Sequence, residues 1–362
     1  MKKFFVDPDI RRAETLPAYF YQDPEVFDSL KERVFYRSWQ WCGDKRLVPQ
    51  TGSAYPFEFI EGYITEPMLL VHSHDKGVKC LSNVCTHRGN ILISKPGKVS
   101  QLVCGYHGRR FDLDGCFQSM PEFKEAIDFP RPCDSLHEFR LWNWNGFLFT
   151  AIDPLFDFSE VAKVLDERLG FLPLEEFKLD KSLSRDYLVN CHWALYCDNY
   201  LEGFHIPFVH EGLNEVLDYG EYETVLYRHL NLQIGYATDS DEVFDLPEGH
   251  PDYGRKVAAY YYCLFPNMMF NFYPWGLSVN IVKPISPDQT MVSFISYVCD
   301  ESKLDRGAGA QLHTVELEDE EVVEAVHKGL KSRVYKTGRF SPSRETAVHH
   351  FHSLLANYLN EA

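Results

Sequence analysis

The sequence predicts an α+β protein with two parts: a small antiparallel β domain, and a larger domain in which a curved antiparallel sheet covers a helix. Short alternating apolar runs, broken by glycine and proline, fill the region from Trp41 to about Thr150. Strand-like runs recur between residues 180 and 300, of which 260–265 and 291–298 are examples. Two different groups of metal-ligating residue types also occur, one in each part. Together these observations indicate two domains of different chemistry.

The chain is long enough for this division. Its 362 residues, 45% hydrophobic and 15% aromatic, can supply two cores. We expect an N-terminal arm and helix over residues 1–42 that pack on the larger domain, the small β domain over 43–152, and the larger domain over 153–362. In the arm, Asp23 and Pro24 are typical of an N-cap and a first helical residue.

Charge and cysteine content restrict the partners and the compartment. Lys+Arg 36 against Asp+Glu 53 gives a net charge of −17, which repels nucleic acid and anionic membranes. No apolar run has transmembrane length, and Asp7 and Pro8 interrupt the opening segment before a signal peptide could form. Ten cysteines without a secretory leader indicate a reducing cytoplasm. A functional cysteine would then be a metal ligand or a nucleophile.

The most specific pattern lies in the small domain. Cys85-Thr86-His87 and Cys104-Gly105-Tyr106-His107 each offer one thiolate and one imidazole. Zinc modules usually bring pairs of like ligands, so zinc is the weaker alternative. A Rieske [2Fe–2S] cluster needs this mixture, with Cys85 and Cys104 on one iron and His87 and His107 on the other. Three glycines beside these ligands suit loops whose backbone approaches sulfur closely: Gly89, Gly105 and Gly108.

A second group of ligand types follows at residues 197–210. Placed on one helix, Asp198, Glu202 and His205 fall at i, i+4 and i+7, so two carboxylates and an imidazole share a face. Pro207 must end or kink that helix, and the bend would let His210 converge with His205. This pattern predicts that His205 and His210 bind one metal ion.

The two motifs carry a family resemblance. Residues 85–89, 104–108 and 111–115 resemble the Rieske domain of the Rieske non-haem iron oxygenases, and residues 190–210 resemble the start of the catalytic domain of their alpha subunits. The resemblance implies a helix-grip fold for the larger domain, with a Rieske cluster and a mononuclear Fe(II) as cofactors. The chain departs from the family at Gly105, Arg109 and His192, where proline, tryptophan and asparagine are frequent.

A ferrous site of this class needs a carboxylate beside its two histidines. The acidic run 316–321 supplies the candidates. Asp319 falls at the centre of an apolar stripe formed by Val322, Val323, Val326 and Leu330, and a carboxylate on such a stripe is costly unless it is paired or metal-bound. Asp319 is therefore the predicted third ligand, and Glu316 is the alternative. The other acids of the run are interpreted as solvated charges.

The resemblance also gives roles to the two acids of the 197–210 group. Glu202 matches the acid that bridges, across a subunit boundary, from a Rieske histidine of one chain to an iron-binding histidine of the next. The implied termini are His107 and His205, and the implied assembly is a homotrimer. Asp198 is predicted to support a ligand histidine.

The resemblance therefore predicts the oxygenase component of a two- or three-component system. Because the chain has no flavin or nicotinamide motif, electrons must come from a separate flavin- or ferredoxin-type reductase. The expected enzyme is an O2-dependent oxidoreductase that hydroxylates or oxidatively demethylates a small organic substrate. Residues 199–207 look most like the choline, carnitine and glycine betaine oxygenases, which predicts a quaternary ammonium substrate.

Two alternatives about the substrate remain open. A hydroxylating oxygenase acting on the ring of an aromatic acid fits the same family. Aromatic side chains on the strands could form a cage for a quaternary ammonium or could only fill the core. The residues considered for the cage are Tyr260, Tyr262, Phe270, Phe272, Tyr273 and Trp275.

Overall fold

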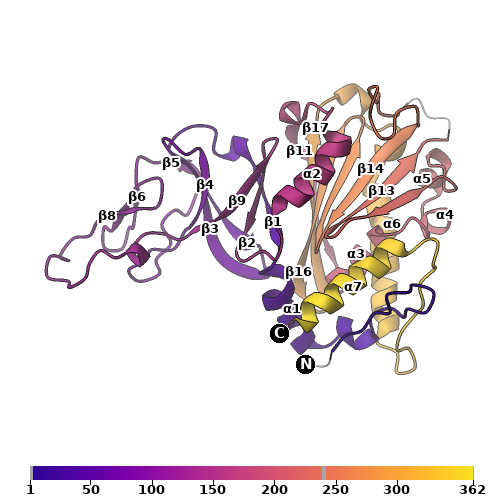
Figure 1. Ribbon diagram of the computed structural model, residues 1–362, viewed down its shortest axis with the longest axis horizontal. Helices are drawn as coiled ribbons and strands as arrows, with labels where there is room; N and C mark the ends of the chain where they lie inside the picture. The colour runs from indigo at the N-terminus through magenta and orange to yellow at the C-terminus, as the bar shows by residue number, and fades with distance from the viewer. Residues whose placement is uncertain (1–2, 239–241, 362) are drawn as a thin grey trace. The chain divides into compact units, whose positions relative to one another are not determined.

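The computed structural model describes residues 3–238 and 242–361. The chain divides into two compact units, one of residues 39–155 and one of the segments 1–38 and 156–362. Figure 1 shows the elements of both units, which are described in turn.

The smaller unit consists of antiparallel strands. Seven form a sheet in the order β1-β10-β9-β4-β3-β2-β5, and three form a second sheet in the order β6-β7-β8. The bounds are β1 Trp39–Asp44, β2 Ser53–Ile60, β3 Ile64–His72, β4 Val78–Ser82, β5 Gly97–Lys98, β6 Leu102–Val103, β7 Arg110–Phe111, β8 Phe117–Ser119, β9 Glu138–Trp144 and β10 Phe147–Ala151. Strand β2 contains a proline, and β2 and β9 both contain charged residues, which weaken the apolar alternation along these strands.

The core of the smaller unit fixes the position of its cysteines. Cys85 and Cys104 are packed with Leu69, Leu81 and Phe111 in one apolar cluster. The loops that begin at the two cysteines are thereby anchored in the core.

The larger unit is built on one antiparallel sheet in the order β11-β17-β16-β15-β14-β13-β12. The bounds are β11 Lys178–Val189, β12 Glu223–Leu226, β13 Leu230–Tyr236, β14 Val257–Leu264, β15 Met268–Tyr273, β16 Gly276–Ser286 and β17 Gln289–Val298. With helices covering this curved sheet and all strand pairs antiparallel in both units, the predicted α+β class is confirmed.

The helices of the larger unit come from both ends of its chain. Their bounds are α1 Pro24–Leu30, α2 Phe158–Leu169, α3 Trp193–Tyr200, α4 Ile206–Val209, α5 Glu211–Val216, α6 Leu312–Leu330 and α7 Thr346–Asn360. Helices α3 and α6 pack on each other, and α3 also contacts β16. The predicted cap of α1 is present, since the Asp23 side chain accepts a hydrogen bond from the N–H of Glu25.

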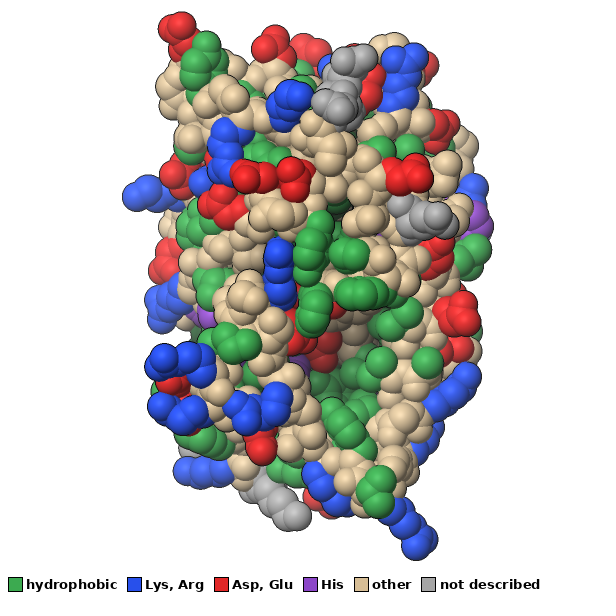
Figure 2. All heavy atoms as spheres, turned by 90° about the vertical axis from the view of Figure 1, so that its right-hand side faces the viewer, with side chains coloured by type: hydrophobic (Ala, Val, Ile, Leu, Met, Phe, Trp, Pro, Cys, Tyr) green, Lys and Arg blue, Asp and Glu red, His purple; other side chains and the backbone are tan. Residues whose placement is uncertain are grey.

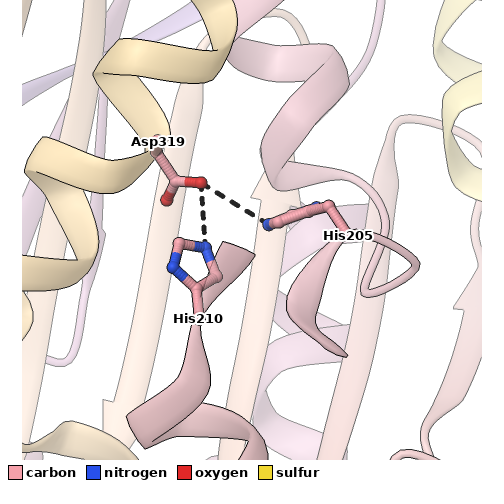
Figure 3. A group of neighbouring side chains, drawn as sticks. All are labelled: His205, His210 and Asp319. Carbon is pink, nitrogen blue, oxygen red and sulfur yellow. Dashed lines mark hydrogen bonds and ion pairs between the residues drawn. The ribbon is translucent and has the colours of Figure 1, made fainter. Parts of the chain in front are cut away.

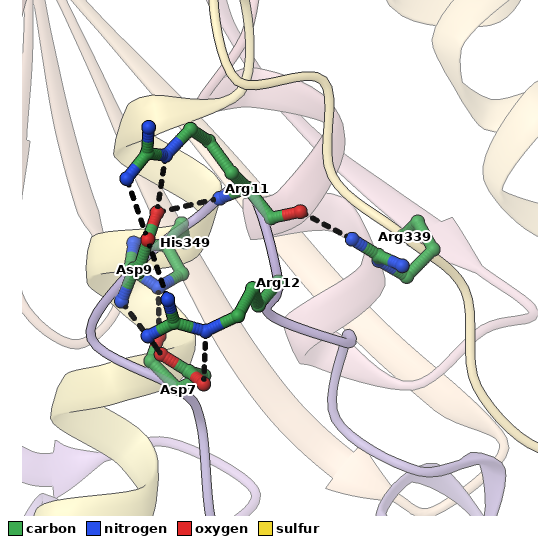
Figure 4. Close-up of polar contacts among 6 residues, drawn as sticks. All are labelled: Asp7, Asp9, Arg11, Arg12, Arg339 and His349. Atoms are coloured by element: carbon green, nitrogen blue, oxygen red, sulfur yellow. Dashed lines mark hydrogen bonds and ion pairs between the residues drawn. The ribbon is translucent and has the colours of Figure 1, made fainter.

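The N-terminal arm is tied to the C-terminal part of the same unit (Figure 4). His349 of α7 lies 2.7 Å through Nε2 from the carbonyl oxygen of Asp7, and Arg339 donates to the carbonyl of Arg11. Within the arm, Arg12 pairs with Asp9 at 3.0 Å. Most of these charges are exposed, so the backbone contacts hold the arm more than the ion pairs do.

Candidate metal centres

In the smaller unit, Cys85 and Cys104 open two loops of the same backbone geometry. In each loop the N–H of the cysteine donates to the carbonyl oxygen five residues later, at 2.8 Å, and the N–H of the glycine four residues later donates to the cysteine carbonyl, at 2.9 and 3.0 Å. These glycines, Gly89 and Gly108, have φ values of 69° and 73°, a conformation that favours glycine. One turn geometry, used twice, therefore presents both cysteine–histidine pairs, although one residue separates Cys85 from His87 and two residues separate Cys104 from His107.

The surroundings of the two sulfurs fit an iron–sulfur cluster. Cys85 and Cys104 are 1% and 2% exposed, and backbone N–H groups of each loop hydrogen-bond to its sulfur. Asn90 Nδ2 lies 3.6 Å from Cys104 Sγ. Burial raises the pKa of Cys85, whereas at Cys104 the N–H donors outweigh burial and lower the pKa. The His87 and His107 rings are 4.8 Å apart, and the Cys85 and Cys104 side chains hydrogen-bond to each other. The two imidazoles thus lie together and the two thiols lie together, as a Rieske cluster requires of its ligands.

Two of the positions that depart from the family pattern have different structural roles. Gly105 lacks a positive φ, and a Cβ placed on it would meet no protein atom within 4 Å, so neither the backbone nor the surrounding protein requires glycine at this position. Arg109 is 2% exposed and donates through Nη2 to Asp134 Oδ1 at 2.7 Å. Its guanidinium carbon also lies 4.9 Å from the centre of the Phe117 ring.

Five of the eight other cysteines are buried: Cys42, Cys80, Cys191, Cys197 and Cys263. The other three, Cys116, Cys133 and Cys299, are exposed.

In the larger unit, the prediction of one helix through Asp198, Glu202 and His205 was wrong. Helix α3 ends at Tyr200, and the short helix α4 begins at Ile206. Pro207 lies in the first turn of α4, where its missing N–H removes no helical hydrogen bond, so it starts a helix instead of bending one. The turn between the two helices, and not a shared helical face, brings the ligand types together.

The structure brings His205, His210 and Asp319 together (Figure 3), and one ligand atom of each lies within 4.8 Å of the others. His205 Nε2 lies 3.5 Å, and His210 Nε2 3.0 Å, from the same oxygen, Oδ1 of Asp319. A mononuclear non-haem iron site uses this donor set: two imidazole nitrogens and one carboxylate oxygen on one side of the metal, with the other coordination positions open. The residues present therefore fit such an ion.

A carboxylate faces the second ring nitrogen of each histidine. Glu202 Oε1 lies 2.8 Å from His205 Nδ1, and Glu318 Oε2 lies 2.7 Å from His210 Nδ1. Such contacts fix a histidine's tautomer and leave Nε2 for a metal. The interpretation of Glu318 as a solvated charge was wrong. In the sequence, the indication of this role is the position of Glu318 next to Asp319. The sequence cannot show that His210 lies between the two carboxylates.

Glu316, the alternative third ligand, lies apart from this group. Its Oε2 accepts a hydrogen bond from the Tyr196 hydroxyl at 2.5 Å. The apolar stripe used to select Asp319 is also displaced on α6: Val326 is 44% exposed, whereas Glu316, Val323 and His327 are buried. The structure thus groups Asp319 with the histidines although the buried side of α6 is centred elsewhere.

Asp198 makes different contacts from the predicted ones. Its Oδ1 lies 2.9 Å from Nε2 of His352, and its Oδ2 accepts from the Tyr21 hydroxyl at 2.9 Å. The predicted support of an iron-binding histidine by Asp198 is therefore replaced by a link between α3, α7 and the N-terminal arm. Two further histidines of α7 have separate partners: His349 contacts the carbonyl oxygen of Asp7, and His350 contacts the side chain of Asn231.

A cavity of about 110 Å³ opens beside His205, His210 and Asp319. Figure 2 looks onto the larger unit and shows a hollow with mainly hydrophobic walls and acidic side chains at its depth. Among the lining residues that the structure describes, the charged side chains are Glu202, Glu316 and Asp319, with no lysine or arginine. Its aromatic lining consists of Tyr196, Tyr200, Tyr222, Tyr261, Tyr273 and Phe294.

Of the aromatic residues considered for a cage, only Tyr273 lines this cavity. Along β14, Tyr261 faces the cavity, and its neighbours Tyr260 and Tyr262 are buried on the opposite face, where the Tyr260 hydroxyl donates to Asp252. Both faces of the sheet are covered and apolar, so the sequence alternation could not indicate which face lines the cavity. Of the two alternatives for these aromatic residues, filling the core therefore holds for all of them except Tyr273.

The fold and the two centres together define a Rieske iron–sulfur protein with a second, mononuclear metal site. Comparison with known families agrees. Residues 38–136 match the Rieske [2Fe-2S] domain, and residues 173–361 match the ring hydroxylating alpha subunit (catalytic domain). The chain belongs to the family of ring-hydroxylating, Rieske non-haem iron oxygenase alpha subunits, as its motifs indicated, and it is an oxidoreductase of that family.

Relatives match over almost the full chain. Choline monooxygenase from Arabidopsis thaliana is 30% identical over 98% of this chain and 85% of its own length. The oxygenase subunit of carnitine monooxygenase from Escherichia coli is 29% identical over 97% and 95%. The quaternary ammonium Rieske monooxygenase CntA, solved with L-carnitine, has a TM-score of 0.75 at 23% identity, covering 97% of each chain. Naphthalene 1,2-dioxygenase from Rhodococcus has a TM-score of 0.72 at 18% identity over 96% and 95%, so the fold is shared across different substrates.

Within residues 3–238 and 242–361, no helix combines the length and the apolar character needed to cross a bilayer.

Proposed function

We propose that this chain is the oxygenase component of a multicomponent system that hydroxylates or oxidatively demethylates a small quaternary ammonium compound. It would use O2 and electrons from a separate reductase. Relatives named for choline and carnitine support the substrate class. The observation that carries the proposal is the cavity beside His205, His210 and Asp319, whose charged lining residues are all acidic and whose walls are rich in tyrosine. Such a lining favours a cation.

We further propose which residues hold the cofactors. Cys85, His87, Cys104 and His107 would bind the [2Fe–2S] cluster in the small domain at residues 43–152. His205, His210 and Asp319 would bind the mononuclear iron in the domain at 153–362. When bound, the two centres supply one-electron transfer and O2 activation.

The protein groups then position the reactants. Glu202 and Glu318 accept hydrogen bonds from the outer nitrogens of His205 and His210, which holds both rings in orientation. The buried tyrosines restrict the cavity to a small, weakly hydrated head group. Gln233, Asn271 and Asn280 also line the cavity and supply amides that can hydrogen-bond a polar tail of the substrate.

We also propose that the chain works as a homotrimer, in which Glu202 links His205 to His107 of a neighbouring chain. The side chain of Glu202 is 14% exposed, so part of it remains accessible in the single chain. Size determination of the purified protein by light scattering tests this assembly, and full turnover by a monomer would contradict it.

Hydroxylation of an aromatic acid is the alternative reaction. Three acidic residues and no lysine or arginine among the described lining residues make the cavity unfavourable for an anionic substrate.

Oxygen uptake coupled to product formation separates the two reactions. The purified oxygenase, with a Rieske reductase that supports electron delivery, is supplied with choline, carnitine, glycine betaine, benzoate and salicylate. Product formation from one or more quaternary amines, and none from the aromatic acids, is expected. Coupled oxidation of an aromatic acid alone would overturn the proposal.

A further inference from the structure

Glu316 is a buried carboxylate that faces the cavity and is only partly paired. It lies on α6, one turn before Asp319, and is 3% exposed. Oε2 accepts a hydrogen bond from Tyr196 at 2.5 Å, while Oε1 is buried and receives no hydrogen bond from any residue that the structure describes. Glu316 lines the same cavity as Asp319 and His210.

A carboxylate in this position carries an electrostatic cost in the protein alone. Transfer of a carboxylate from water into a buried site is unfavourable without a cation or several hydrogen bonds. Burial raises the pKa of Glu316 to about 8; the Tyr196 hydrogen bond opposes this, and the nearby Asp319 and Glu320 add to it. The protein groups that bear on Glu316 are thus acids and a tyrosine, and none of them provides a positive charge. The mononuclear iron would be held by Asp319 and the two histidines and not by Glu316.

The aromatic residues that line the cavity beside Glu316 are suited to binding a cation. Tyr196, Tyr261 and Tyr273 line the cavity with Glu316, and the Tyr261 and Tyr273 rings pack edge to face at 5.9 Å. Aromatic faces attract a desolvated cation, and a carboxylate adds a direct charge interaction. A methylated ammonium group has no N–H to satisfy, so it needs only these two features.

We propose that Glu316 is the counter-charge for the cationic head group of the substrate and thereby determines the enzyme's preference for cations. The inference rests on the proposed function and extends it to one residue. Tyr196 holds the carboxylate through Oε2, which leaves Oε1 for the substrate. Because Glu316 and Asp319 are one helical turn apart on α6, the head group would be held beside the mononuclear iron site.

Ligand charge and protein charge can be varied independently to test this. Calorimetry on the loaded enzyme without reductant measures binding without turnover. The ligands are choline and 3,3-dimethylbutan-1-ol, which has the same shape with carbon in place of the charged nitrogen. The proteins are the wild type, E316Q, E316D, and E321Q as a matched change at an exposed position of the same helix.

We expect E316Q to bind choline at least about tenfold more weakly than the wild type, with the affinity for the neutral alcohol unchanged or increased. E316D, which keeps the charge, should retain a preference for choline, and E321Q should behave as the wild type. Equal losses for both ligands in E316Q would indicate a packing role and would overturn the inference.

The role of Glu316 and the proposed substrate class can be disproved separately. A wild type that binds choline, carnitine or glycine betaine while E316Q binds them equally well overturns the role of Glu316 alone. A wild type that binds none of these cations overturns the proposed substrate class and the inference with it. Thermal melting and iron content of each variant establish that folding and metal loading are unchanged.

Discussion

Glu318 and Asp319, adjacent on α6, contact opposite nitrogens of the same imidazole. Glu318 Oε2 lies 2.7 Å from Nδ1 of His210, and Asp319 Oδ1 lies 3.0 Å from its Nε2. His210 is 1% exposed, so its ring has little freedom to rotate away from these partners. Neighbouring helical residues usually point in different directions, and here the imidazole lies in the gap between them. One carboxylate is therefore placed to support the ring, and the other to share the metal.

Replacing Glu318 by Gln should weaken iron binding at the mononuclear site by about 10- to 100-fold, because the charge that orients His210 is lost. Chelator competition followed by iron analysis measures this affinity, with the absorbance of the cluster as an internal reference. E321Q, at an exposed position of the same helix, is the control. Equal iron affinity in E318Q and E321Q would show that Glu318 has no such role.

The choice between Asp319 and Glu316 as third ligand can be tested by removing each carboxylate. D319A should lose the mononuclear iron, with a drop in affinity beyond roughly 100-fold, the upper range for supporting partners. E316A should retain it, because Glu316 contacts Tyr196 and not the histidines. Iron content per cluster absorbance reports both. Retention of the iron by D319A with its loss in E316A would reverse the assignment.

Removal of the buried cation in the smaller unit should destabilise that unit. R109A would remove the buried cation that contacts Asp134 and leave Arg131, through its N–H and its exposed guanidinium, as a partner. Breaking a buried ion pair costs about 3 to 5 kcal/mol of unfolding free energy, and the remaining contacts with Arg131 place the expected loss at the lower end, about 3 kcal/mol. Chemical denaturation followed by cluster absorbance and tryptophan fluorescence measures the change. The exposed neighbour Arg110 gives a matched control, R110A. If R109A unfolded at the same denaturant concentration as R110A, the Arg109–Asp134 pair would have no net stabilising role.

His192 should make the larger unit sensitive to acid. Its side chain is fully buried at the start of α3, where burial lowers the pKa to about 3, and Nδ1 accepts a hydrogen bond from the N–H of Ala194 at 3.3 Å. In the unfolded chain His192 takes up a proton near pH 6.5, whereas in the folded chain it stays neutral. The contribution of neutral His192 to the free energy of unfolding is therefore complete above pH 6.5 and decreases as the pH falls towards 3.

The variant H192N keeps a helix-capping side chain without this titration. Between pH 7.5 and pH 5 the wild type should lose about 2 kcal/mol more unfolding free energy than H192N. Because the comparison is between pH values, a constant cost of the smaller side chain cancels. Parallel pH dependence of the two proteins would contradict the expectation.

The sequence by itself determined the fold class and the chemistry of both centres. Within each cysteine–histidine pair, Cys85 with His87 and Cys104 with His107, the spacing is short enough for one turn, so local geometry brings its two members together. The strand-like runs at 260–265 and 291–298 likewise predicted strands β14 and β17 of the larger sheet. Patterns of this kind are readable because each depends on residues near one another in the chain.

The tertiary structure decided which residues meet across the chain. It ended α3 at Tyr200, placed Glu318 against His210, and paired Asp198 with His352 instead of a ligand histidine. It also chose the face of β14 that lines the cavity, placing Tyr261 there instead of its neighbours. These contacts depend on how α3, α6 and the sheet pack against one another. When a helix or strand is buried on several sides, its sequence does not indicate which neighbour each side chain will contact.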